Sequence, residues 1–253
     1  MFFAKYGSGK NVFVGLHGWS GDHRTFAPLV QYLSEDATFY SADLPGNGKS
    51  PLPEEFTLER VVSEIAEGLQ SLNHLDMTII GSCSGGLLGL FVVKRLLEMG
   101  QSRILKRLVI IDPFAYFPWY FKVFIAPELG KIGWYAYYTA FANPIGRWMT
   151  NISLRKHRVE GAHLTDSFTG INHRVTYRYL QLLAEGGDAK QFSCINIPVV
   201  IVYGEKTFGA VRDSVPVWKA ILPQSSCLEL RGAAHLPIEE TPIELAKLVF
   251  QYN

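Results

Sequence analysis

Cysteine is scarce in this 253-residue chain, and the three that occur, Cys83, Cys194 and Cys227, lie far apart. An odd number of widely spaced cysteines does not form a disulfide framework, and no CxxC or Cys/His spacing of a zinc site is present. This usage fits a reducing compartment. We therefore expect a cytoplasmic protein without a bound metal.

The sequence also lacks long runs of like charge and long apolar runs. Its 24 basic and 23 acidic residues give a formal net charge of +1, so the charge pattern predicts no nucleic-acid partner. No run of about 18 apolar residues could cross a bilayer, and the first residues lack the apolar core of a signal peptide. An apolar content of 48% favours a soluble globular protein of one domain with an insertion. The oligomeric state stays open.

Strand and helix patterns alternate along the chain. Strands are predicted at 11–16, 38–42, 77–80, 107–111, 197–203 and 227–230, and helices at 25–33, 57–72, 84–99, 213–222 and 241–251. This order is typical of an α/β protein whose mostly parallel sheet has helices on both faces. The rhythm stops between the fourth and fifth strands. We therefore expect residues 1–112 and 196–253 to form the core and residues 113–195 to form an insertion.

The insertion is predicted to be a helical cap, and it is rich in aromatic residues. Thirteen of them fall between Pro113 and Trp148. They either pack the cap onto the core or line a site for a bulky apolar ligand. A third interpretation, contact with a membrane surface, is disfavoured by the small number of Lys and Arg residues in this stretch.

A candidate nucleophile lies where the strand at 77–80 turns into the following helix. Gly81 and Gly85 are two positions on either side of Cys83, and small residues there allow a tight elbow with the central side chain projecting outward. The helix would begin at about Ser84, so its free amides and dipole would favour a thiolate at Cys83. The alternative is that Cys83 is a small buried apolar side chain.

A candidate base follows the strand at 227–230. His235 is expected at the carboxyl edge of the sheet, where the Cys83 elbow also lies. An imidazole in this place can accept the proton of the thiol. The alternative is a surface histidine or one that caps the last helix.

Candidate oxyanion donors follow the first predicted strand. Gly18 lets the chain turn so that the amide of Trp19 points toward the nucleophile. Together with the amide of Ser84, it would form a two-donor oxyanion hole. The side chains of His17 and Trp19 are expected to pack under the loop.

The order of these motifs resembles that of the α/β-hydrolase family with a helical cap. The matching segments are residues 16–19, 43–50, 81–86, 202–206 and 232–235. The resemblance assigns the nucleophile to Cys83, the base to His235, and the oxyanion donors to the amides of Trp19 and Ser84. It places the cap at residues 113–195, and the turn at 43–50 is expected to be structural.

The chain departs from the family pattern at two positions. The usual nucleophile is serine, whereas Cys83 resembles a minority of members such as dienelactone hydrolases and polyhydroxyalkanoate synthases. The usual acid position holds Thr207, which has no carboxylate. Asp112, at the end of the strand at 107–111, is then the candidate acid, because some family members use this position; its alternative role is to cap the turn. Asp213 and Glu205 are weaker candidates, since both fit ordinary surface or helix-start charges.

These residues predict hydrolysis of an ester or thioester carbonyl through an acyl-cysteine intermediate. A cysteine paired with histidine depends less on a carboxylate than a serine does, so the two departures fit together. No cofactor is expected, because the chain supplies the nucleophile, the base and the oxyanion donors, and the expected partner is a small apolar acyl substrate. Two alternatives stay open: an acyltransferase that uses the same cysteine, and a catalytically silent small-molecule binder.

Overall fold

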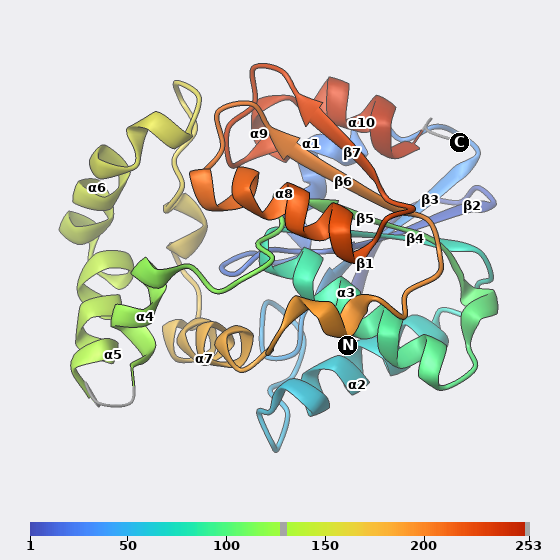
Figure 1. Ribbon diagram of the computed structural model, residues 1–253, viewed down its shortest axis with the longest axis horizontal. Coiled ribbons are helices and arrows are strands. Elements are labelled where there is room, and N and C mark those ends of the chain that lie inside the picture. The colour runs from blue at the N-terminus through green and yellow to red at the C-terminus, as the bar shows by residue number, and fades with distance from the viewer. Residues whose placement is uncertain (127–130, 251–253) are drawn as a thin grey trace.

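A seven-stranded sheet forms the centre of the fold in the computed structural model, which describes residues 1–126 and 131–250 (Figure 1). The strand order is β1-β3-β2-β4-β5-β6-β7; β1 pairs antiparallel with β3, and all other pairs are parallel. The predicted α/β architecture is therefore confirmed. The strands are β1 (Phe2–Gly7), β2 (Asn11–Leu16), β3 (Ala37–Asp43), β4 (Met77–Ser82), β5 (Leu105–Ile111), β6 (Val199–Gly204) and β7 (Ser226–Leu230).

Helices cover both faces of the sheet (Figure 1). Successive side chains of a strand point to opposite faces, so Ile79 of β4 packs with one helical layer and Ile80 with the other. Strands covered on both faces are mostly apolar, as β4 and β6 are here. One layer contains α2 (Leu58–Ser71), α3 (Ser84–Glu98) and α8 (Gly209–Ile221), and the other contains α1 (Ala27–Val30), α9 (Pro237–Glu240) and α10 (Pro242–Phe250).

Three details differ from the sequence prediction. Strand β1 was missing from it, because a single short strand at the sheet edge carries a weak pattern. The helix predicted at 25–33 is a 3-10 turn, His23–Phe26, followed by the short α1, and it ends in turns in which Tyr32 N bonds Leu29 O (3.1 Å). Helix α8 begins four positions before residue 213. The last residue of the helix predicted at 241–251 lies outside the described residues.

Between β5 and β6 the described residues form helices and turns and no strand. Helices α4 to α6 lie to one side of the sheet, at the left of Figure 1, and α7 lies level with α5, on the side of α5 nearer to α2 and α3. No helix in the described parts of the chain has the length and apolarity needed to cross a membrane. The helices are α4 (Trp119–Ile125), α5 (Lys131–Tyr137), α6 (Pro144–Ser153) and α7 (His173–Ala184), with a π-helical turn at Tyr138–Ala142 and 3-10 turns at Arg155–His157, Asp166–Phe168 and Ala189–Phe192.

Candidate active site

Cys83 lies in the tight turn between β4 and α3, and its backbone has the left-handed conformation of such a turn. Its φ is +51°, and its amide donates to the carbonyl of Ile111 (2.7 Å). A Cβ at Gly85 would lie 2.2 Å from the carbonyl oxygen of Leu16, and one at Gly81 would lie 2.4 Å from Gly85 O. The two glycines are therefore needed for the close backbone approach at this elbow, which holds the thiol at the first turn of α3.

Asp112 is the first residue after β5, and its carboxylate is almost completely buried, with 1% of the residue exposed. Its φ is +51°, and its amide donates to Val202 O (2.8 Å), which holds this end of β5 beside β6. One carboxylate oxygen, Oδ1, accepts the amide of Gly204 (2.9 Å). The other, Oδ2, faces the loop after β7.

His235 lies in that loop, and its Nδ1 is 2.8 Å from Asp112 Oδ2. Burial acts to lower the pKa of His235, but hydrogen bonds with the side chains of Asp112 and Cys83 raise it to about 10. The imidazole is thus held by a carboxylate, and the Cys83 side chain acts to raise its pKa. The phenyl ring of Phe208 lies with its centroid 4.6 Å from that of the imidazole, which limits the motion of the ring.

Thr207 belongs to the same hydrogen-bond network, although it has no charge. Its hydroxyl donates to Asp112 Oδ2 (2.5 Å) and lies 3.4 Å from His235 Nδ1. The residue at the family's usual acid position therefore contacts the carboxylate that reaches the imidazole. The other two candidate acids are not brought to His235: Asp213 is exposed on α8, and exposed Glu205 accepts the amide of Gly232 (2.8 Å).

The loop after β2 passes directly beside the elbow. A Cβ at Gly18 would lie 3.5 Å from Cys83 Cβ, so the chain at this glycine approaches the candidate nucleophile closely. The indole of Trp19 donates to Thr176 O (2.7 Å) and packs edge-on against Phe168, with a centroid separation of 5.0 Å. The backbone amides of Trp19 and Ser84 have no acceptor among the described residues.

His17 lies under this loop and not in the site. Its Nδ1 donates to Gly18 O (2.7 Å), and its Nε2 accepts the amide of Leu44 (3.1 Å). Burial lowers the pKa of His17, in keeping with a neutral ring that donates at one nitrogen and accepts at the other.

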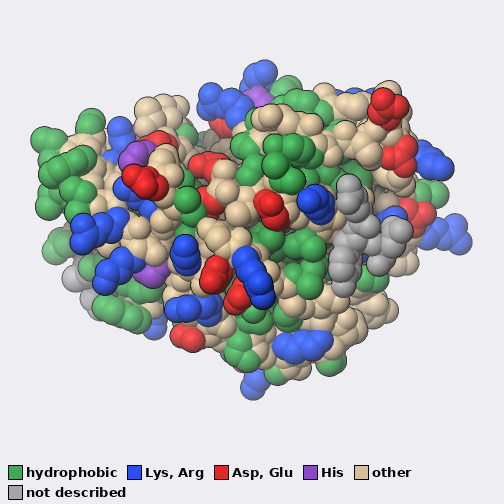
Figure 2. Space-filling view, turned by 90° about the horizontal axis from the view of Figure 1, so that it is seen from above, with side chains coloured by type: hydrophobic (Ala, Val, Ile, Leu, Met, Phe, Trp, Pro, Cys, Tyr) green, Lys and Arg blue, Asp and Glu red, His purple; other side chains and the backbone are tan. Residues whose placement is uncertain are grey.

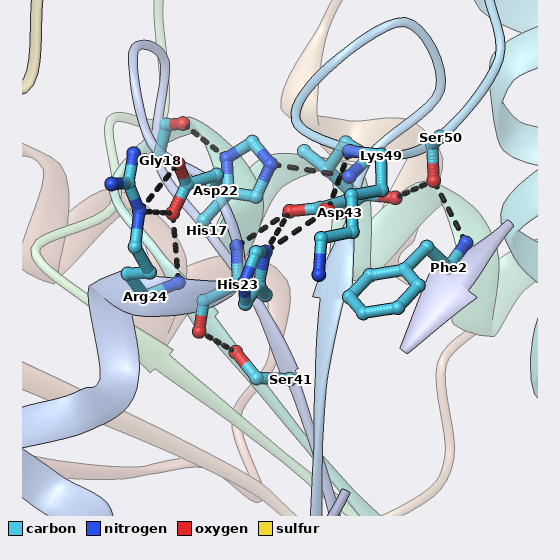
Figure 3. Close-up of polar contacts among 11 residues, drawn as sticks. Phe2, His17, Gly18, Asp22, His23, Arg24, Ser41, Asp43, Lys49 and Ser50 are labelled. Atoms are coloured by element: carbon cyan, nitrogen blue, oxygen red, sulfur yellow. Dashed lines mark hydrogen bonds and ion pairs between the residues drawn. The ribbon is translucent and has the colours of Figure 1, made fainter. Parts of the chain in front are cut away.

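The turn at 43–50 is held by the buried carboxylate of Asp43 (Figure 3). Asp43 Oδ1 accepts the amide of His23 (2.6 Å), and Oδ2 accepts that of Lys49 (2.8 Å). Ligand-type atoms of Asp22, His23 and Asp43 lie within 4.8 Å of one another, but the carboxylate of Asp22 is paired with Arg24 and that of Asp43 bonds the loop. This cluster fastens two loops and gives no reason to assign a metal.

A cavity of about 510 Å³ connects the elbow with the helices between β5 and β6. Cys83, His235 and Trp19 lie in its wall, together with many aromatic and aliphatic side chains of residues 114–192. In the described part of the chain, the charged residues that line it are His235 and Glu239, and no Lys or Arg does so. Burial raises the pKa of Glu239.

Phe208 and Glu239 also line this cavity, although neither belongs to a motif of the sequence. Phe208 directly follows Thr207, and Glu239 lies four residues after His235, so each could have been found only as a neighbour of a motif residue. A thiol, an imidazole and a carboxylate arranged in this order can perform nucleophilic acyl transfer, with two free amides beside the thiol.

Comparison with known proteins identifies the family. The sequence pattern of the alpha/beta hydrolase family matches residues 12–248, and the chain belongs to this family. A pimeloyl-[acyl-carrier protein] methyl ester esterase of Neisseria meningitidis is 25% identical over 236 residues, which cover 90% of this chain and 72% of that protein. An esterase of the same description from Sodalis glossinidius is 23% identical over 265 residues, covering 100% and 97% of the two chains.

Solved structures agree with the fold. An esterase from Thermogutta terrifontis has a TM-score of 0.77 at 16% identity, covering 99% of this chain and 92% of that one. A lipase-esterase related protein from Clostridium acetobutylicum has a TM-score of 0.76 at 15% identity, covering 100% and 99%. The relatives thus include esterases with the same fold; the cysteine nucleophile stays a prediction.

Proposed function

We propose that this chain is a hydrolase that cleaves an ester or thioester of an apolar acyl group through Cys83. The observation that carries the proposal is geometric: His235 Nδ1 lies 2.8 Å from Asp112 Oδ2, and His235 and Cys83 lie in the wall of the same apolar cavity. Residues 1–112 and 196–253 would provide this array, and residues 113–195 would act as a cap that closes the substrate cavity. A reducing compartment such as the cytoplasm would keep the thiol free.

In the proposed reaction, the thiolate sulfur of Cys83 attacks the carbonyl carbon while His235 holds the thiol proton. The carbonyl π electrons move to oxygen, and the amides of Trp19 and Ser84 stabilise the oxyanion. Collapse of this intermediate breaks the bond to the leaving alcohol or thiol, which takes the proton from His235. Asp112 keeps the imidazole oriented throughout.

Water completes the cycle. A water molecule gives a proton to His235 as its oxygen attacks the acyl-cysteine, and collapse then releases the carboxylic acid and regenerates the Cys83–His235 pair. The apolar lining of the cavity supports an apolar acyl group, and the absence of Lys and Arg from its described lining disfavours an anionic group inside it. The methyl ester named for the relatives is one ester of this class.

Intact-mass spectrometry tests the proposal. The wild type, Cys83→Ala and the matched control Cys194→Ala, which alters an exposed cysteine, are each mixed briefly with activated esters and acyl thioesters of graded chain length. Free acid is measured in parallel. The proposal predicts an acyl adduct and acid release in the wild type and in Cys194→Ala, and neither in Cys83→Ala.

Other outcomes separate the alternatives. An adduct at Cys83 that persists without release of acid would contradict hydrolysis and favour transfer to an alcohol, amine or thiol acceptor, for which the aromatic cavity wall would exclude water. The absence of both an adduct and acid release with every donor would contradict both enzyme functions and favour a silent binder.

A further inference from the structure

The outer faces of helices α4, α5 and α6 are apolar. Six large hydrophobic side chains there are each more than 60% exposed, and we call them the outer apolar face. In the described part of the chain, Leu75 is the one other large hydrophobic side chain exposed to that extent, at 65%. Exposed apolar groups concentrated in this way mark an interaction site. The six are Trp119, Ile132, Tyr135, Ile145, Trp148 and Met149.

Helix α6 shows the arrangement most clearly. Ile145, Trp148 and Met149 are 70%, 64% and 61% exposed, and their spacing of three and four places them on one side of the helix. Thr150 and Leu154 line the cavity. The apolar side of α6 thus faces away from the protein, whereas a surface helix ordinarily turns such a side inward.

Basic residues accompany the outer apolar face. Between residues 113 and 158 the sequence has six Lys and Arg residues and one acidic residue, Glu128, which lies outside the described range. Lys122, Lys131, Arg155 and Lys156 are exposed. Figure 2 shows hydrophobic side chains at the end of the molecule where α5 and α6 lie, with Lys and Arg side chains next to them.

We propose that the outer apolar face binds an anionic lipid surface. Trp and Tyr side chains favour the headgroup level of a bilayer, Ile and Met enter the acyl boundary, and Lys and Arg beside them attract anionic lipids. The sequence alone disfavoured this interpretation because few basic residues lie before Trp148. Three more follow at Arg155, Lys156 and Arg158, and the exposure of the apolar residues shows that they do not pack the core.

The position of the face has a consequence for the substrate, which rests on the proposed function. Since α6 borders the cavity on one side and carries the outer apolar face on the other, a docked protein would hold its cavity at the bilayer surface. The acyl group could then pass from the lipid phase into an apolar cavity. The substrate class would be an amphiphilic ester or thioester that partitions into membranes.

Vesicle flotation tests the proposal with the full chain. Vesicles of phosphatidylcholine alone are compared with vesicles of phosphatidylcholine and phosphatidylglycerol, at low and at physiological salt. The variant Ile145→Gln/Trp148→Gln removes two anchors from solvent-exposed helix positions, Leu75→Gln is the matched control, and Lys122→Gln/Lys156→Gln removes charge. None of these residues lines the cavity.

The proposal predicts that the wild type floats with the anionic vesicles and that salt weakens this binding. Binding should fall at least roughly tenfold in Ile145→Gln/Trp148→Gln, fall in the lysine variant on anionic vesicles only, and stay within about twofold in Leu75→Gln. An absence of vesicle binding by the wild type, or an equal loss in Leu75→Gln, would overturn it.

A competing occupant of the face is a second copy of the chain. If the wild type is oligomeric by size-exclusion chromatography, if Ile145→Gln/Trp148→Gln makes it monomeric and if vesicles bind neither, the face is a self-association surface and the lipid proposal is wrong. Hydrolysis of a soluble short-chain ester is measured on the same samples and should be equal in all of them. Vesicle binding without any hydrolysis would refute the proposed function and leave the lipid surface standing.

Discussion

The substitution Asp112→Asn isolates the contribution of the buried carboxylate to the candidate site. The side chain keeps its shape, so its oxygen can still accept the amide of Gly204, as Asp112 Oδ1 does at 2.9 Å. The second position changes from an acceptor to an NH₂ donor, 2.8 Å from His235 Nδ1 in the present geometry. An NH₂ group there requires an unprotonated Nδ1 and therefore places the proton on Nε2.

This change removes the function we propose for His235. Burial acts to lower the pKa of His235, and the hydrogen bonds with Asp112 and Cys83 raise it to about 10. Without the carboxylate, the effect of burial is opposed mainly by Cys83, so the pKa of His235 falls and Nε2 no longer accepts the thiol proton. The corresponding change in a serine triad costs about 10⁴-fold in kcat. For a more readily ionised thiol we expect a fall of about 10²- to 10³-fold in kcat/KM at neutral pH.

Two assays separate positioning from structural damage. The first is kcat/KM for a soluble short-chain ester, and the second is the pH dependence of alkylation of Cys83 by iodoacetamide, which reports the thiolate without requiring turnover. In Asp112→Asn the pH profile should shift, because loss of the carboxylate lowers the pKa of the neighbouring His235. Asp213→Asn, which alters an exposed carboxylate, is the matched control and should leave both measurements within about twofold of the wild type.

The proposed role of Asp112 would be refuted if folded Asp112→Asn kept more than half of the wild-type kcat/KM. A loss of activity with an unchanged alkylation profile would also refute it, because Asp112 would then act only through the structure of the β5 end. Circular dichroism and the melting temperature establish that the variant is folded.

Three further measurements test the hydrogen-bond network of His235 and the elbow at Cys83. The pKa of His235 is raised in the folded state, so His235 stabilises the fold fully below its unfolded pKa of about 6.5, and this stabilisation is lost as the pH rises toward about 10. Urea unfolding should therefore show that the difference in free energy of unfolding between the wild type and Asp112→Asn shrinks over this pH range. Gly85→Ala should lower the free energy of unfolding by about 3 kcal/mol or more, because its Cβ would lie 2.2 Å from a carbonyl oxygen of β2. A Cβ at Gly209 would have no atom within 4 Å, so the control Gly209→Ala should change this free energy by less than about 1 kcal/mol. Thermal melts measure both variants. Adding Thr207→Asp to Asp112→Asn should recover roughly tenfold of the lost kcat/KM, because position 207 already reaches His235 Nδ1 at 3.4 Å; no recovery would contradict the shared role of the two positions.

Local sequence signals predicted the parts of the fold that depend on neighbouring residues. The elbow at Cys83 follows from two glycines and an apolar strand within ten residues, and the regular apolar spacing of α2 predicted a helix that the structure confirms. The prediction of one helix at 25–33 was wrong. A local apolar pattern does not show how much of a helix tertiary packing stabilises, and only a short one forms there.

Long-range contacts were beyond the reach of these signals. Asp112 and Thr207 are 95 residues apart, and only the pairing of β5 with β6 brings them together. The aromatic residues between β5 and β6 are a second example, since Phe141 is buried and Trp148 is 64% exposed although both belong to the same aromatic stretch. The composition gives the number of these residues, but it does not show which of them line the cavity and which form the outer apolar face.

The contact between Asp112 and Thr207 explains how the acid of such a site can follow either β5 or β6 while the histidine stays in place. Strands β5 and β6 are parallel neighbours, with Ile111 opposite Val202, so their carboxyl ends open onto the same side of the imidazole. A carboxylate after either strand can therefore reach Nδ1. When the carboxylate follows β5, its buried oxygen still needs a hydrogen-bond donor from the residue after β6. The hydroxyl of Thr207 is such a donor and adds no second charge. In the proposed mechanism, Thr207 therefore does not mark a lost activity, because its hydroxyl bonds the carboxylate of Asp112, the proposed acid.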